Sequence, residues 1–145
     1  MYLAKQLISR HVVTGFPEQR LAYLSDKIKA SSAHYCAVLK PKTFTLLGLV
    51  RFSDVAANST WAGRIFSDLM QPPPSHEVYD SDPVEKVIDL LWNDPSEIAV
   101  IKKSMEFVGL ITPDSFFRWL LAKTLPEGVG LERIPSNSQW NPYLR

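Results

Sequence analysis

An internal duplication is the feature that most constrains this chain. Residues 47–54 read LGLVRFSD and residues 108–115 read VGLITPDS, so each segment is an apolar strand with a glycine that runs into a helix start. At the same offset of 61 or 62 residues, residues 37–38 align with 99–100, and residues 7–8 align with 69–70. Self-similarity at a fixed period is the mark of a repeated structural unit.

Each copy is predicted to run in the order strand, helix, strand, strand, helix. β-branched and apolar runs bounded by turn residues predict the strands, and apolar residues at helical spacing predict the helices. In the first copy we expect strands at 11–14, 34–39 and 43–50, with helices at 18–30 and about 53–57. In the second copy we expect strands at 76–79, 97–101 and 105–111, and helices that have Pro83 and Pro113 at their first positions. Residues 61–70 are expected to link the copies as a helix.

The duplication also predicts the domain organisation. A unit of about 60 residues is marginally stable alone, whereas pairing the two sheets would bury the apolar strands. We therefore predict an α+β fold of two β-α-β-β-α repeats that pack sheet to sheet with pseudo-twofold symmetry. Repeat 1 would cover residues 1–60, residues 61–124 would hold the linker helix and repeat 2, and residues 125–145 would form an irregular tail rich in Pro, Gly, Asn and Ser.

Charge and hydropathy exclude several classes of partner. The net charge is +1, so no strongly basic face of the kind that nucleic-acid binding needs is forced on the surface. The sequence contains no run of about 18 apolar residues, so we expect no transmembrane helix. Lys5 and Arg10 interrupt what would be the apolar region of a signal peptide. We therefore expect a cytoplasmic protein.

Catalytic and metal-binding patterns are missing from the sequence. Cys36 is the one cysteine, and it lies in an apolar run that predicts a small buried side chain. His11, His34 and His76 are scattered, so no zinc-type spacing arises. The chain has no G-x-S-x-G elbow, no P-loop and no H-E-x-x-H motif. We expect no enzyme activity and no required cofactor.

The repeated order of elements resembles the CBS domain, and its duplication resembles a tandem CBS pair, or Bateman module. The resemblance covers about residues 1–124. It depends on the segments 5–8 and 67–70, the strand-to-helix openings at Val13 and Val78, the hairpin cores at 37–38 and 99–100, and the strand glycines Gly48 and Gly109. It implies a regulatory module that binds AMP, ADP, ATP or a related adenosyl ligand between the repeats. It also implies a homodimer and a regulated partner protein whose identity is unknown.

The ligand pattern of CBS domains is Gly, two apolar residues, Thr or Ser, any two residues, then Asp. The resemblance implies that the Asp accepts hydrogen bonds from the ribose hydroxyls, while the hydroxyl and the amides of the helix start hold phosphate. In the first copy Gly48 and Asp54 are in register, but Arg51 replaces the Thr or Ser. A guanidinium can still hold phosphate through two parallel hydrogen bonds.

The second copy matches the pattern differently. Gly109 and Thr112 are in register, but Ser115 occupies the Asp position. Asp114 lies one residue early, which turns it about 100° away on a helix. Asp114, Thr112 and Gly109 are the residues of this copy that we expect to contact the ligand, as Gly48, Arg51 and Asp54 are in the first.

Two further residues, Thr14 and Tyr79, complete the predicted ligand-binding set. They lie at strand ends that border the cleft in this family, and a tyrosine ring can stack on a base. Several of the predicted residues also have an ordinary structural role. First-turn aspartates stabilise helices, a threonine caps a helix, and a strand glycine permits close approach of a neighbouring segment.

Two other functions stay open at this point. The same fold can serve as a ligand-free module for dimerisation or protein interaction, which the departures at Arg51 and Ser115 favour. Aromatic residues are enriched at the centres of interfaces, so Trp119 is a candidate for a subunit contact. A small enzyme with an unrecognised site is the other alternative, and substrate turnover would reveal it.

Overall fold

The computed structural model describes residues 1–22, 33–57 and 64–124. Most of the helix predicted at 18–30, part of the linker at 61–70 and the whole tail at 125–145 lie outside these residues. The first half of the chain contains η1 (Ala4–Leu7), β1 (Val12–Gly15), β2 (Tyr35–Leu39), β3 (Leu46–Arg51), α2 (Phe52–Ala57) and α3 (Phe66–Leu69). The second half contains β4 (His76–Tyr79), α4 (Val84–Asn93), β5 (Ile98–Ile101), β6 (Phe107–Ile111) and α5 (Pro113–Thr124).

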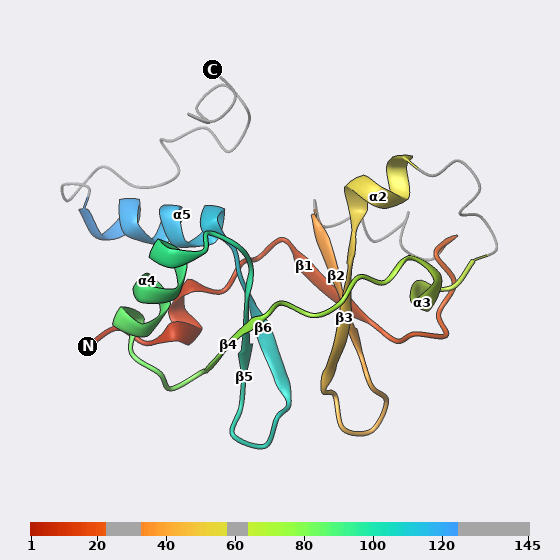
Figure 1. Ribbon diagram of the computed structural model, residues 1–145, viewed down its shortest axis with the longest axis horizontal. Coiled ribbons are helices and arrows are strands. Elements are labelled where there is room, and N and C mark those ends of the chain that lie inside the picture. Colours follow the sequence, from red (N-terminus) through yellow and green to blue (C-terminus); the bar gives the residue numbers. More distant parts are fainter. Residues whose placement is uncertain (23–32, 58–63, 125–145) are drawn as a thin grey trace.

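The two halves build the same small sheet. In order β1-β2-β3, the first pair is parallel and the second antiparallel, and β4-β5-β6 repeats this arrangement. Both hairpins carry a register shift at the same place, after Val38 in one copy and after Val100 in the other. The sheets stand side by side, with α2 and α5 at one end of the molecule and both hairpin tips at the other (Figure 1). The α+β fold of paired repeats is therefore confirmed.

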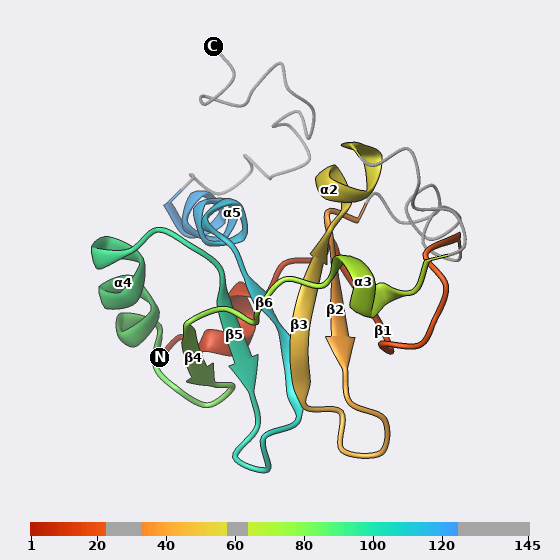
Figure 2. The same ribbon diagram turned by 45° about the vertical axis from the view of Figure 1, so that its right-hand side comes forward.

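Apolar residues from both sheets form a shared core. Ala37, Leu39 and Leu49 from the first sheet pack with Phe107 and Leu110 from the second, and all five are buried. We call this contact the seam. Because the buried faces of two three-stranded sheets cover each other here, the seam supplies the burial that neither repeat has alone. Figure 2 shows the same sheets after a turn about the vertical axis.

The short helices that precede each repeat pack against the other repeat. Ala4 and Leu7 of η1 lie in the core of the second half, whereas Phe66 of α3 is fully buried in the core of the first half. Backbone hydrogen bonds hold both segments in matching positions. Ser9 donates to the carbonyl of Leu110, and Gln71, 62 residues later, donates to the carbonyl of Leu49. This crossed arrangement is direct evidence of pseudo-twofold symmetry.

The start of the first long helix was predicted wrongly. Residues 17–21 form turns and a bridge, and only Ala22 is helical within the described part of this segment. Arg20 forms a β-bridge with Ile65, and Leu21 donates to the carbonyl of Arg64. Tertiary pairing with the segment before α3 therefore overrides the helical spacing seen in the sequence.

Two other local predictions also need correction. The linker helix predicted at 61–70 is helical only at Phe66–Leu69 within the residues described. In the second repeat Pro83 is the residue that precedes the helix, which begins at Val84. By contrast, Cys36 is fully buried, as predicted.

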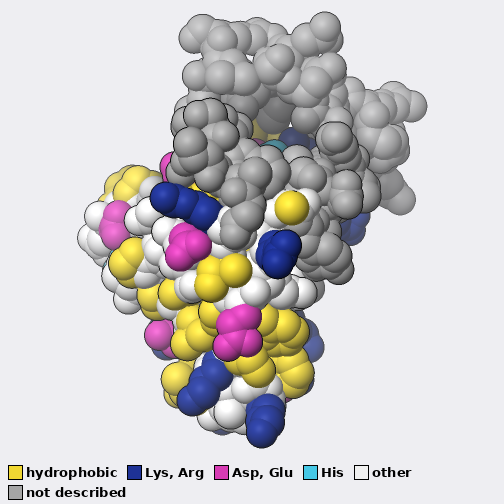
Figure 3. Space-filling view, turned by 90° about the vertical axis from the view of Figure 1, so that its right-hand side faces the viewer, with side chains coloured by type: hydrophobic (Ala, Val, Ile, Leu, Met, Phe, Trp, Pro, Cys, Tyr) yellow, Lys and Arg dark blue, Asp and Glu magenta, His cyan; other side chains and the backbone are white. Residues whose placement is uncertain are grey.

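Among the residues described, no helix is long and apolar enough to cross a membrane. On one side face, Lys and Arg side chains are interspersed with Asp and Glu side chains and with apolar ones (Figure 3). The described part of that face therefore carries no broad field of a single sign.

Candidate ligand-binding site

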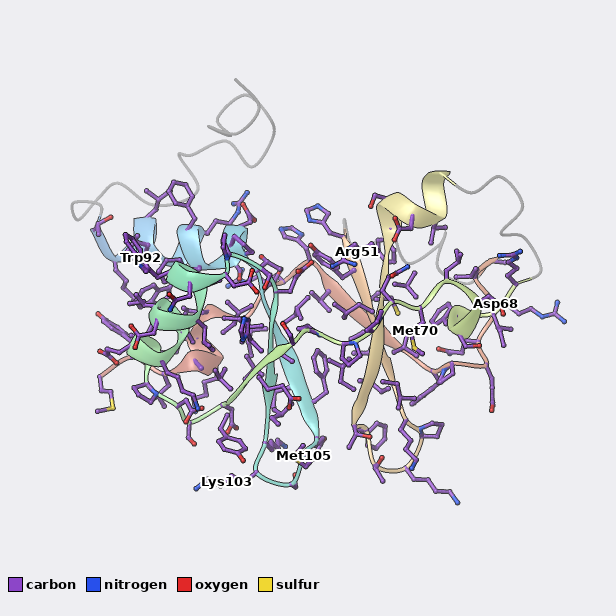
Figure 4. All side chains as sticks on the ribbon, in the orientation of Figure 1. Arg51, Asp68, Met70, Trp92, Lys103 and Met105 are labelled. Atoms are coloured by element: carbon purple, nitrogen blue, oxygen red, sulfur yellow. The ribbon has the colours of Figure 1, made fainter. Side chains whose placement is uncertain are left out.

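The seam ends where β3 and β6 enter their helices, and the predicted ligand-binding pattern lies there in both copies. Arg51 is the last residue of β3, and Thr112 stands between β6 and α5. Figure 4 shows Arg51 at the end of β3 nearest to α2. We call the surroundings of Arg51 the first edge (Tyr35, Arg51, Asp54 and Glu97) and those of Thr112 the second edge (His11, His34, Thr112, Asp114, Ser115 and Arg118).

An ion pair across the seam dominates the first edge. The Nη2 atom of Arg51 donates to Oε1 of Glu97 at 2.9 Å. Arg51 belongs to the first repeat, whereas Glu97 comes immediately before β5 of the second, so the pair connects the repeats. The side chain of Glu97 is 17% exposed and that of Arg51 39% exposed. The guanidinium also lies 6.0 Å from the centroid of the Tyr35 ring, within cation–π range.

Burial and the contacts among these groups shift their pKa values. Burial would raise the pKa of Glu97, but hydrogen bonds from its own backbone, from Arg51 and from Tyr35 outweigh burial and lower it. The hydrogen bond to Glu97 raises the pKa of Arg51. Burial raises the pKa of Tyr35, and the charge of Glu97 raises it further. Glu97 is therefore held as a carboxylate beside a permanent cation.

Asp54 lies in the first turn of α2 and is exposed. Its negative charge contributes to the raised pKa of Arg51, which places the two side chains in one electrostatic environment. The structure thus places Arg51 and Asp54, two of the first-copy residues that the sequence selected, in the same surroundings. It adds Tyr35 and Glu97, which the sequence reasoning missed because a long-range partner of Arg51 has no local signal.

At the second edge, Thr112 and Ser115 form reciprocal hydrogen bonds between backbone amide and side-chain hydroxyl. The amide of Thr112 donates to Oγ of Ser115 at 2.9 Å, and the amide of Ser115 donates to Oγ1 of Thr112 at 3.0 Å. The Ser115 hydroxyl also donates to the carbonyl of Thr112 at 3.0 Å. These reciprocal bonds form a capping box at the start of α5, as predicted for Thr112 as a cap. They occupy the hydroxyl and the amide that the family pattern would offer to phosphate.

Charged and imidazole groups surround this closed cap. Asp114 is exposed and accepts a hydrogen bond from Nε of Arg118 at 3.2 Å, one helical turn away. The rings of His11 and His34 stack with centroids 4.8 Å apart. Partial burial lowers the pKa of His34, His11 and Arg118 lower it further, and Asp114 opposes them. The charges at the start of α5 in the second repeat therefore influence the pKa of His34 in the first.

The two strand glycines accommodate the crossing segments. A Cβ atom on Gly48 would meet the side chain of Met70 and the backbone carbonyl of Gln71. Figure 4 shows Met70 beside β3. A Cβ atom on Gly109 would meet Ile8. Both glycines thus permit the close approach of a neighbouring segment, and their contact with a ligand stays a prediction.

Thr14 and Tyr79 lie in β1 and β4, where each strand pairs in parallel with its neighbour. Both side chains are exposed, and the amide of Tyr79 donates to the carboxylate of Asp82 at 2.7 Å. Their contact with a ligand also stays a prediction.

A small cleft lies away from both edges, beside the hairpins. Its volume of about 80 Å³ is well below the several hundred Å³ of a typical ligand pocket. None of the predicted ligand-binding residues lines it. Its lining residues are Thr45, Leu46, Pro73, Pro74, Glu77, Ala99, Ile101 and Met105. In the described part of the chain, no three His, Cys, Asp or Glu side chains are grouped to hold a metal ion.

The structure is thus a duplicated module, in which two three-stranded sheets of the same strand order pack together and the short helices that precede each repeat are exchanged. No protein-family model matches the sequence, and no curated protein sequence matches it. Solved structures, however, match it with high significance.

The CBSX2 protein of Arabidopsis thaliana, solved in complex with AMP, matches with a TM-score of 0.66 and 21% identity, over 86% of this chain and 100% of that one. The CBS domain pair of protein MJ0100, solved with 5′-methylthioadenosine and S-adenosyl-L-methionine, matches with a TM-score of 0.65 and 15% identity, over 86% and 99%. The M. jannaschii protein MJ1004 matches with a TM-score of 0.69 and 14% identity, over 83% of this chain and 60% of that one. The chain therefore has the fold of a tandem pair of CBS domains.

Proposed function

We propose that the protein is a non-catalytic regulatory module that binds an adenine nucleotide or a related adenosyl ligand at the first edge of the seam. The observation that carries the proposal is the grouping of Arg51 and Asp54 at a helix start, with the ion pair to Glu97 reaching across to the other repeat. The carboxylate of Asp54 would accept hydrogen bonds from the ribose hydroxyls. The AMP complex of CBSX2 and the adenosyl complexes of MJ0100 support this class of ligand.

Regulation would follow from the position of the site between the repeats. A ligand that contacts both repeats stabilises the relative arrangement in which its contacts are best, and it shifts the population toward that arrangement. The Arg51–Glu97 pair links the repeats in the same place, so ligand contact with either residue would change how the repeats are held together. A partner protein that contacts both repeats would sense the change.

A thermal-unfolding series with adenosine, AMP and ATP tests the proposal. A ligand at about 100 times its dissociation constant adds about 2.7 kcal/mol to the unfolding free energy, so the midpoint should rise with concentration. Asp54→Ala should weaken binding markedly, whereas Asp89→Ala, which removes an exposed carboxylate from α4, should leave it unchanged. The absence of any shift at millimolar ligand, or unchanged affinity in Asp54→Ala, would contradict the proposal.

A ligand-free homodimerisation or protein-interaction module is the second candidate. The closed cap at Thr112 favours it, and so do exposed apolar residues on the helices of the second repeat. Ile88 and Leu120 are partly exposed, and Trp92 is 86% exposed. Exposed apolar side chains that gather into a patch mark interaction sites. Sedimentation velocity would show a dimer, which Trp92→Ser should weaken, whereas a monomer at all concentrations would count against homodimerisation.

A further inference from the structure

The first edge has an unusual balance of charge for a phosphate site. It contains one guanidinium, that of Arg51, and two carboxylates, those of Asp54 and Glu97, so its formal charge is 1 − 2 = −1. The guanidinium is already bound to Glu97 at 2.9 Å. A phosphate that approaches Arg51 therefore meets a cation whose charge is neutralised by an anion of the protein itself.

Glu97 is firmly held in this place. Its side chain is mostly buried, and it accepts a hydrogen bond from Nη2 of Arg51 at 2.9 Å. Since Glu97 comes immediately before the fully buried strand β5, its backbone has little freedom to carry the carboxylate away. Displacement of Glu97 would therefore leave a mostly buried carboxylate without its cation.

Two routes would bring a phosphate to Arg51, and both are unfavourable. If the phosphate replaces Glu97, a largely buried carboxylate loses its cation. If it binds beside Glu97, two anions share one guanidinium and repel each other. An adenosyl ligand with a neutral or positively charged 5′ substituent avoids both costs, while its ribose can still hydrogen-bond to Asp54.

We propose that Glu97 is a specificity-determining residue, which competes with ligand phosphate for Arg51 and makes the first edge selective for adenosyl ligands without a 5′ phosphate. This inference depends on the proposed function, because it concerns the choice among ligands at the same site. On this proposal Arg51, which the resemblance implies as a phosphate ligand, holds phosphate only after Glu97 is removed.

Isothermal titration of the wild type and of Glu97→Gln with adenosine, AMP and ATP tests this proposal. The wild type should bind adenosine at least as tightly as AMP. Glu97→Gln should bind AMP about tenfold more tightly than the wild type, or more, since one recovered charge contact of about 1.4 kcal/mol is tenfold in affinity. Its affinity for adenosine should change by less than about threefold, or 0.7 kcal/mol on the same scale. Glu77→Gln, which neutralises an exposed residue of β4, is the matched control and should change neither affinity.

The possible results separate the two proposals. If the ligands bind but the ratio of AMP to adenosine affinity is the same in Glu97→Gln, the role of Glu97 is refuted while the binding site stands. A wild type that prefers AMP over adenosine by tenfold, about 1.4 kcal/mol, also refutes it. If no ligand binds either protein at millimolar concentration, the proposed function itself fails. Should Glu97→Gln not fold, as judged by its thermal unfolding, Glu97→Ala replaces it with the same expected ratio.

Discussion

The two edges of the seam have matching backbones and different chemistry. Arg51 and Thr112 occupy equivalent positions at the ends of β3 and β6, and Tyr35 and Glu97 occupy equivalent positions at the starts of β2 and β5. At the first edge an ion pair spans the repeats, whereas at the second edge a capping box closes within a single repeat. Duplication therefore fixes where the equivalent residues lie, and the individual side chains decide the chemistry of each edge.

The largest expected effect concerns the glycines behind the two edges. Gly48→Ala should destabilise the protein by about 3 kcal/mol, because the new methyl group meets a backbone carbonyl, that of Gln71, which cannot turn aside. Gly109→Ala should cost only about 1–2 kcal/mol, since its obstacle is the side chain of Ile8. Urea unfolding of both variants measures the difference. Equal losses would show that the crossing segments are held alike in the two halves.

A smaller effect is expected at the cap of the second edge. Thr112→Ala should destabilise the protein by about 1 kcal/mol, because the amide of Ser115 loses its acceptor at the start of α5. Thr112→Ser retains the hydroxyl and serves as the matched control. The comparison uses urea unfolding at neutral pH. If the alanine variant is as stable as the serine variant, the cap contributes nothing and the second edge is more open than its hydrogen bonds indicate.

The smallest expected effect is a difference between the two edges in how the unfolding free energy depends on pH. Partial burial lowers the pKa of His34 from 6.5, so its contribution to stability is present above pH 6.5 and is lost as the pH falls through the folded-state pKa. The lowered pKa of Glu97 gives a contribution present above pH 4.5 that is lost only as the pH falls further. Unfolding free energies measured across pH should show that His34→Gln loses less stability than the wild type just below pH 6.5. An identical pH dependence in the two proteins would show that the protonation of His34 does not affect stability.

Most of the fold could be predicted from the sequence because each repeat has its own local pattern of apolar and turn residues. The apolar strands around Val38 and Val100, each followed by a glycine-bearing strand, carry their own periodicity, and the seam follows from the need to bury them. The crossing of η1 and α3 could not be predicted, since Ala4 and Phe66 show only that they are apolar, not which core they enter. The bridge between Arg20 and Ile65 has no local signal in the sequence either, and it displaces the start of the helix predicted near residue 18.

The site was predictable only in part, for a similar reason. Arg51 and Asp54 belong to one short motif, so their proximity can be inferred from spacing alone. Glu97 lies 46 residues from Arg51, and nothing local in the sequence indicates that the two side chains meet. The Ser115 departure was visible in the sequence, but only the structure shows that its hydroxyl closes the cap of Thr112.

Backbone amide NMR during a titration with adenosine tests the central claim most directly, because it locates the ligand without a mutation. The account predicts that the largest shift changes occur at residues 51–55 and 96–98, on both sides of the Arg51–Glu97 pair. Changes confined to residues 11, 34, 112, 114 and 115 would place the ligand at the second edge and contradict the account. So would a spectrum that does not change at millimolar adenosine.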